Sequence, residues 1–154
     1  MTGAVLRPFD DIDGPGFAAL AADAREEGHR FLDRMAADWQ AGTNRFDRPG
    51  EMVIGAWVGD TLAGVLGRNI DPHSQDPTVG RLRHLYVRRD MRGRGIGAVL
   101  ARHALADAAA HFRLIRVRMG ADNPGAAAMY NALGFTRVTG DPFATHVLEF
   151  RAGR

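Results

Sequence analysis

The chain has 154 residues, of which 45% are hydrophobic and 25% charged, as expected for one globular domain with its own core. All 20 basic residues are arginine, and a net charge of only +2 argues against a nucleic-acid-binding protein. The absence of cysteine excludes disulfides and thiolate metal sites. No apolar run has membrane-spanning length and no signal-peptide pattern opens the chain, so we expect a single cytoplasmic domain over residues 1–154 without membrane partners.

The first half of the chain predicts a strand, two helices and a β-hairpin. Apolar residues recur at helical spacing between Phe17 and Trp39, with a break at Gly28. Gly59-Asp60 is a hairpin turn signal between two apolar runs. The expected elements are a strand over 4–9, helices over 17–30 and 31–40, and strands over 52–58 and 61–70.

The second half predicts strands that alternate with helices, after a polar loop over 71–80. That loop holds His73 with Asp71 and Asp76, but their spacing matches no metal site, and we expect no metal. The expected elements are a strand over 82–87, a turn over 88–95, a helix from 95 or 96 to 111, a strand over 114–119, a helix over 123–133, and strands over 135–138 and 145–150. This order predicts a mixed α/β (α+β) fold, in which helices flank both faces of one central, mostly antiparallel, twisted sheet.

A glycine-rich turn, Arg92-Gly93-Arg94-Gly95-Ile96-Gly97, lies between the central strand and the long helix. Glycines let a ligand approach the backbone, and the free N–H groups at a helix start bind phosphate. A plain tight connection with solvated arginines is the alternative. The spacing does not fit a dinucleotide-binding fingerprint, and a Walker loop would need a lysine, which the chain lacks.

Two motifs in this region resemble the GNAT superfamily of N-acetyltransferases. Arg92-x-x-Gly95-x-Gly97, preceded by Leu85-Tyr86-Val87, matches that family's Q/R-x-x-G-x-G/A signature. Residues 123–135 resemble its N-x-x-A-x-x-x-Y-x-x-x-G-F segment, and the similarity covers about residues 81–138. The resemblance implies the GNAT fold with about seven strands, acetyl-CoA as cosubstrate and no metal; homodimers are common in that family.

The resemblance also implies where the cofactor lies. The parallel strands over 82–87 and 114–119 would splay apart, so that the pantetheine arm bonds to backbone groups near Leu85 and Val87 while the pyrophosphate binds amides at the helix start. Asn123 would contact the cofactor, cap the next helix, or do both. The implied cofactor-binding residues are Leu85, Tyr86, Val87, Arg92, Gly93, Arg94, Gly95, Ile96, Gly97, Ala98 and Asn123.

Tyr130 matches the tyrosine that acts in the resembled family as the general acid toward the leaving thiolate, although packing is the alternative role for a helical tyrosine. The N–H of Val87 would then stabilise the oxyanion. With no cysteine, no lysine and Ser74 as the only serine, we expect direct transfer rather than a covalent acyl-enzyme.

The general base departs from the family pattern. Relatives place Glu or His two or four residues before the Leu85 position, where this chain has Arg83 and Arg81. Period-two alternation predicts that both arginines share a face with Leu85 and Val87, and that His84 points to the opposite face in a structural role. Arginine cannot act as a base at neutral pH.

Deprotonation of the acceptor could therefore run through water, through Glu51 or Asp71, or be avoided by binding a neutral amine. Arg81 and Arg83 could instead hold an anionic part of the acceptor. The expected activity is acetyl transfer to a primary amine on a small molecule or a protein. The alternatives are another acyl-CoA donor and a non-catalytic acyl-CoA-binding or sensor domain, with a nucleic-acid-binding module as a distant third.

Overall fold

The computed structural model describes residues 3–120 and 123–150, and in them the predicted order of strands and helices is confirmed. The elements are β1 (Val5–Pro8), α1 (Pro15–Glu26), α2 (Phe31–Ala41), β2 (Met52–Val58), β3 (Thr61–Ile70), β4 (Val79–Val87), α3 (Ile96–Ala106), β5 (Leu114–Val117), α4 (Pro124–Ala132), β6 (Thr136–Arg137) and β7 (His146–Glu149). Both hairpin strands have the predicted bounds. The helix predicted to reach residue 111 ends earlier, at Ala106, and a 3-10 turn over Ala108–Ala110 follows it.

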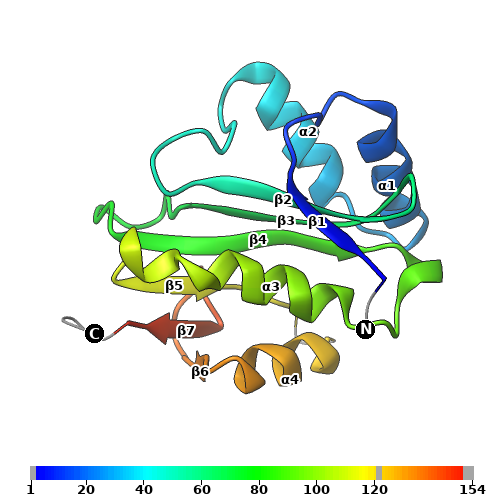
Figure 1. Ribbon diagram of the computed structural model, residues 1–154. Helices are drawn as coiled ribbons and strands as arrows, with labels where there is room; N and C mark the ends of the chain where they lie inside the picture. Colours follow the sequence, from blue (N-terminus) through cyan, green and yellow to red (C-terminus); the bar gives the residue numbers. More distant parts are fainter. Residues whose placement is uncertain (1–2, 121–122, 151–154) are drawn as a thin grey trace.

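One seven-stranded sheet, in the order β1-β2-β3-β4-β5-β7-β6, forms the centre of the fold. Among the described strands β4 and β5 form the one parallel pair, and the other neighbours run antiparallel. Helices α1 and α2 lie on one side of this sheet and α3 and α4 on the other (Figure 1). The predicted mixed fold with helices on both faces is therefore confirmed.

Each face of the sheet carries its own apolar layer. Leu100 and Ala104 of α3 are fully buried in the layer on the α3 side, while Phe17 and Leu20 of α1 are buried in the layer on the α1 side. Burying one such large side chain stabilises the fold by roughly 1.5–3 kcal/mol. None of the helices in the described part of the chain is long and apolar enough to cross a membrane.

A β-bulge interrupts β4 in its second half. Gly67 of β3 pairs with Arg83, but Val65 pairs with Tyr86, so β4 contains one more residue than β3 between these pairs. The extra residue is accommodated at His84, whose φ of 64° lies in the left-handed region that non-glycine residues seldom adopt. Such a bulge reverses which face the following side chains occupy.

The bulge makes the predicted alternation along β4 wrong. Leu85 and Val87 pack against the apolar layer under α3. Arg81 and Arg83 lie on the opposite face: Arg81 donates a hydrogen bond from Nε to Asn69 Oδ1 (3.0 Å), and the charges of the α2 residues Arg34 and Asp38 act on Arg83. His84 lies on this α2 face too, where its ring stacks on Phe31 with the centroids 6.2 Å apart. The arginines and the histidine therefore share a face, and neither arginine shares one with Leu85.

A buried arginine ties β3 to the end of α3. Arg68 is only 2% exposed, and its guanidinium donates to the carbonyl groups of Gly50 and Ala104 and pairs with Asp107 at 2.6 Å. These bonds satisfy a charge that would otherwise be costly to bury.

Candidate active site

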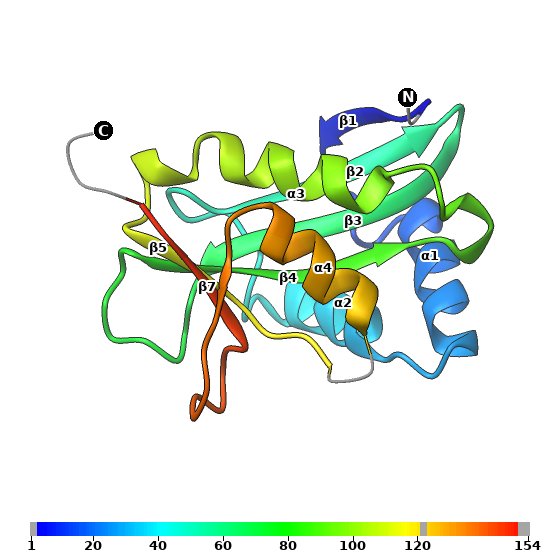
Figure 2. The same cartoon turned by 90° about the horizontal axis from the view of Figure 1, so that it is seen from below.

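The parallel strands β4 and β5 separate partway along their length. Their pairing ends at Leu82 and Val117, whereas β4 continues for five more residues to Val87. In Figure 2 the segment after β5 turns away from β4 toward the start of α4. The Arg88 amide donates to Ala63 of β3 (2.8 Å), so by alternation the N–H and C=O of Val87 point away from β3, toward this gap. The expected splay is therefore present, and it leaves a strand edge able to pair with an extended ligand.

The start of α3 presents open backbone beside the gap. Gly93 and the N-cap residue Gly95 both have φ of 78°, which glycine adopts without strain. The first helical hydrogen bond runs from Val99 to Gly95, so the amides of Ile96, Gly97 and Ala98 precede any intrahelical acceptor. Around a Cβ built on Gly93 there is no atom within 4 Å.

Gly97 shows how the elements converge. A Cβ built on it would lie 3.8 Å from Met129 Sδ, 3.9 Å from Val87 Cγ2 and 4.0 Å from Leu85 Cδ2. The start of α3, the end of β4 and helix α4 therefore meet at one point. A cavity of about 530 Å³ lies at the end of β5, and its lining residues are Arg118, Met119, Gly120, Asp141, Pro142 and Thr145.

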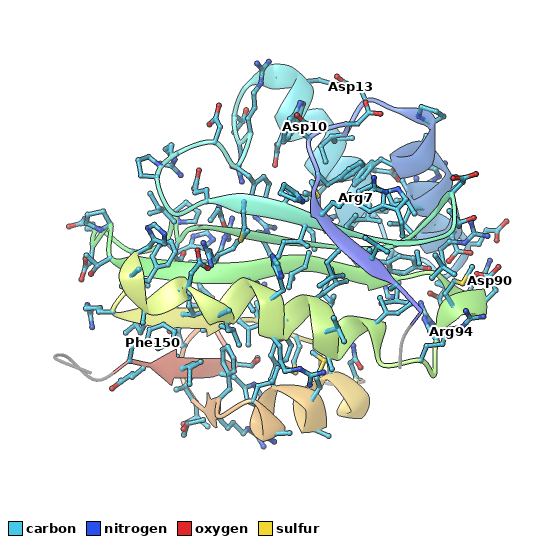
Figure 3. All side chains as sticks on the ribbon, viewed as in Figure 1. Arg7, Asp10, Asp13, Asp90, Arg94 and Phe150 are labelled. Carbon is cyan, nitrogen blue, oxygen red and sulfur yellow. The ribbon has the colours of Figure 1, made fainter. Side chains whose placement is uncertain are left out.

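The two arginines of the turn behave differently. The Arg92 guanidinium makes a two-pronged ion pair with Glu27, the C-cap residue of α1, and its Nε donates to the Val87 carbonyl (3.0 Å). Its side chain therefore fastens the turn to the end of α1, and a contact with a phosphate stays a prediction. Arg94 is exposed at the end of the molecule where β4 leads into α3 (Figure 3), and it makes no hydrogen bond or ion pair with a described residue.

Two carboxylates, Asp23 of α1 and Glu27 at its C-cap, hold the turn in place, and the sequence reasoning missed both. The Tyr86 hydroxyl lies 2.7 Å from Asp23 and 2.8 Å from Glu27, and Asp23 also accepts the Arg89 amide. Burial, together with these two carboxylates, raises the pKa of Tyr86. Because Tyr86 points toward α1, only its backbone faces the β4 edge. The four-residue spacing of Asp23 and Glu27 at the end of the predicted helix was the available signal.

Tyr130 lies in α4, on the α3 side of the sheet. It is 3% exposed, and its ring meets Phe135 edge to face with centroids 5.2 Å apart. Its hydroxyl makes no hydrogen bond with a described residue, and burial raises its pKa, so the phenol stays protonated at neutral pH. Asn123 accepts the Ala126 amide (3.1 Å), which confirms it as the N-cap of α4.

Comparison with known proteins adds a decisive observation. Residues 17–135 match the family model described as the acetyltransferase (GNAT) family, which is most of the chain. The chain belongs to this family. No curated protein sequence matches it at a significant level.

Solved structures share the GNAT fold over nearly the whole chain. A protein from Exiguobacterium sp. 255-15, provisionally assigned as an acetyltransferase, has 24% identity and a TM-score of 0.81, covering 95% of this chain and 93% of its own. YncA from Salmonella typhimurium, solved with its cofactor acetyl-CoA, has 17% identity and a TM-score of 0.69, covering 97% and 95%. The NatC complex bound to Gag peptide and CoA has a chain with 18% identity and a TM-score of 0.68, covering 96% and 99%.

The two carboxylates considered as bases are both engaged in this GNAT chain. Glu51 accepts from Arg48 and from the Ile70 amide, and its side chain is 1% exposed. Asp71, equally buried, pairs with Arg116 and accepts the amide of His73. Both carboxylates are therefore buried and already hold hydrogen-bonded partners.

His84 is a neutral side chain on the α2 face. Burial lowers its pKa well below the ordinary value, and the nearby charges of Arg83, Arg81 and Arg34 lower it further. Within residues 3–120 and 123–150 no group of three or more His, Asp or Glu side chains is arranged to hold a metal.

Proposed function

We propose that this chain, acting as one domain, is an N-acetyltransferase that moves the acetyl group of acetyl-CoA directly onto a primary amine. The observation that carries the proposal is the convergence of three features. Open amides at the start of α3 and the β4 edge that β5 leaves both flank the gap between β4 and β5, and α4, the helix that carries Tyr130, reaches the same point through Met129. The fit to CoA is good, because the glycines leave the backbone open where a diphosphate needs amide donors.

The chain's own groups have distinct roles in this proposal. The amides of Ile96, Gly97 and Ala98 bind the diphosphate, with exposed Arg94 as a further donor. The β4 edge orients the pantetheine arm, which brings an activated thioester to the gap. The Val87 N–H stabilises the negative charge that develops on the carbonyl oxygen. Tyr130 donates its hydroxyl proton to the departing sulfur.

Transfer in a ternary complex follows from the residues that the chain lacks. The sequence has no cysteine and no lysine, and the hydroxyl of its single serine, Ser74, accepts the Asp76 amide in a surface loop. No activated nucleophile is therefore present to carry the acetyl group. The amine nitrogen bonds to the carbonyl carbon as the carbon–sulfur bond breaks. The nitrogen then loses one proton, which passes through water to the Tyr130 phenolate left after the sulfur is protonated. Since Glu51 and Asp71 are engaged, the amine binds in its neutral form or loses its proton through water.

The test is release of free CoA thiol from acetyl-CoA in the presence of an amine panel. The panel includes small amines and peptides, because one structural neighbour is solved with a peptide and CoA. We expect thiol release only with an acceptor, and an acetylated product by mass spectrometry. Propionyl-CoA in parallel measures the preference for the acyl chain. Calorimetric binding of CoA without turnover on any amine would instead indicate a non-catalytic acyl-CoA-binding protein.

A further inference from the structure

We propose that the acceptor carries an anionic group, a carboxylate or a phosphate, and that Arg81 and Arg83 bind this group on the α2 face of β4. This inference rests on the proposed function and names the class of its substrate. It also places the acceptor and the cofactor on opposite faces of the same strand.

Arginines from two neighbouring strands gather on this face. Arg81 and Arg83 precede the bulge and lie on the same side of β4, and the register partner of Arg81 in β5 is Arg116. Arg34, on α2, is close enough for its charge to act on Arg83 and His84. The opposite face, where Leu85 and Val87 meet α3 and α4, holds the proposed cofactor site. An acceptor must therefore approach from the α2 face.

Among the described residues neither Arg81 nor Arg83 forms a direct ion pair, although the charge of Asp38 on α2 acts on both. Arg81 donates to the neutral side chain of Asn69, and no described residue forms a hydrogen bond or an ion pair with Arg83. Burial, and then repulsion from Arg83, lowers the pKa of Arg81 to about 10. By contrast, Arg116 is paired with Asp71 at 3.3 Å.

A bound anion offsets the unfavourable free energy of holding these two arginine charges partly out of water. Removing a charge from water is unfavourable unless a partner compensates it, and guanidinium groups match carboxylate and phosphate oxygens in a fork geometry. Arg83 lies two residues before Leu85, roughly 7 Å along the strand. An anion held there leaves an attached amine within reach of the gap.

The experiment compares matched acceptors that differ in charge. One pair is an amino acid and its amide, which tests a carboxylate; the other is phosphoethanolamine and ethanolamine, which tests a phosphate. The variants are Arg83→Met and Arg81→Met, and the control is Arg137→Met, since Arg137 is exposed on the edge strand β6. Calorimetry with CoA and thermal unfolding are measured for each variant.

We expect kcat/KM to favour the anionic member of at least one pair. Arg83→Met should reduce that preference by roughly 10- to 100-fold, mainly through KM, because bonds to charged groups have about this effect. CoA affinity and activity on the neutral amine should stay unchanged, and Arg137→Met should behave as the native protein. The acceptor pair whose kcat/KM ratio changes more in Arg83→Met shows whether the bound group is a carboxylate or a phosphate.

Equal kcat/KM within both pairs would overturn the inference while leaving the acetyltransferase proposal intact. So would an Arg83→Met variant that loses activity equally on charged and neutral amines. Absence of thiol release with every amine would overturn the proposed function, and this inference with it.

Discussion

Tyr130→Phe separates the proposed acid role of Tyr130 from a packing role. The substitution removes one hydroxyl and keeps the ring, including its edge-to-face contact with Phe135. The Tyr130 residue is 3% exposed and its hydroxyl forms no hydrogen bond with a described residue, so loss of the hydroxyl should change the free energy of unfolding by about 1 kcal/mol or less. For a chain of this length that change moves Tm by roughly 2–4 °C at most.

The effect on turnover should be far larger. General acids of this kind contribute roughly 10²- to 10⁴-fold, so kcat should fall at least about 100-fold, which corresponds to about 3 kcal/mol of activation free energy. Because burial raises the pKa of Tyr130, its hydroxyl is protonated throughout the neutral range. Native activity should therefore show no decline from deprotonation of Tyr130 up to about pH 9.

The assay is thiol release at saturating acetyl-CoA and acceptor, with CoA affinity measured by calorimetry. The chain has two tyrosines, and the other provides a matched control. Tyr86→Phe removes the hydroxyl that contacts Asp23 and Glu27, so it should lower stability by about 1 kcal/mol while changing kcat only slightly. If Tyr130→Phe retains native kcat, or if it loses CoA binding and stability instead, the acid role is refuted.

Three further predictions concern the backbone, the core and pH. Gly97→Ala should raise Tm and change CoA affinity by no more than a few-fold, because a methyl group fits beside Met129. Gly97→Leu should weaken CoA binding, measured by calorimetry, at least about tenfold. If Gly97→Leu binds CoA as tightly as the native protein, the open-backbone site is contradicted. Arg68→Met should lower the urea-derived free energy of unfolding by about 3 kcal/mol, because the carbonyl and carboxylate partners stay behind unpaired; a loss below about 1 kcal/mol would contradict this. The hydrogen bonds from Arg68 and Arg92 lower the pKa values of Asp107 and Glu27. The stability that these two carboxylates contribute should therefore be complete above about pH 5 and be lost as pH falls below about 4. Urea titrations at pH 6 and pH 3 test this, and an equal free energy of unfolding at both pH values would contradict it.

Local signals were enough to predict most of the fold. The hairpin of β2 and β3 has its predicted bounds because Gly59-Asp60 and two apolar runs specify it without help from distant residues. The start of α3 is also local, since glycine at position 95 adopts the left-handed conformation that begins the helix. The GNAT motifs then supplied the parallel pair and its splay.

The face of each β4 side chain could not be predicted in the same way. The segment from Arg81 to Val87 contains no glycine to announce a bulge, and the extra residue becomes visible only through its pairing with β3. The ion pair of Arg92 was not predicted for a similar reason, because its partner Glu27 lies 65 positions earlier in the chain. Contacts between distant segments therefore account for both features that the sequence did not show.

Because of the single extra residue in β4, the two halves of this strand present different side chains to the two faces of the sheet. Upstream of His84, Arg81 and Arg83 face the α2 side of the sheet. Downstream, Leu85 and Val87 pack against the layer under α3, while Tyr86 points toward α1. A designer who wishes to retarget the protein toward a new acceptor should therefore vary positions 81 and 83 first. The half of the strand proposed to bind the acetyl donor would be left as it is.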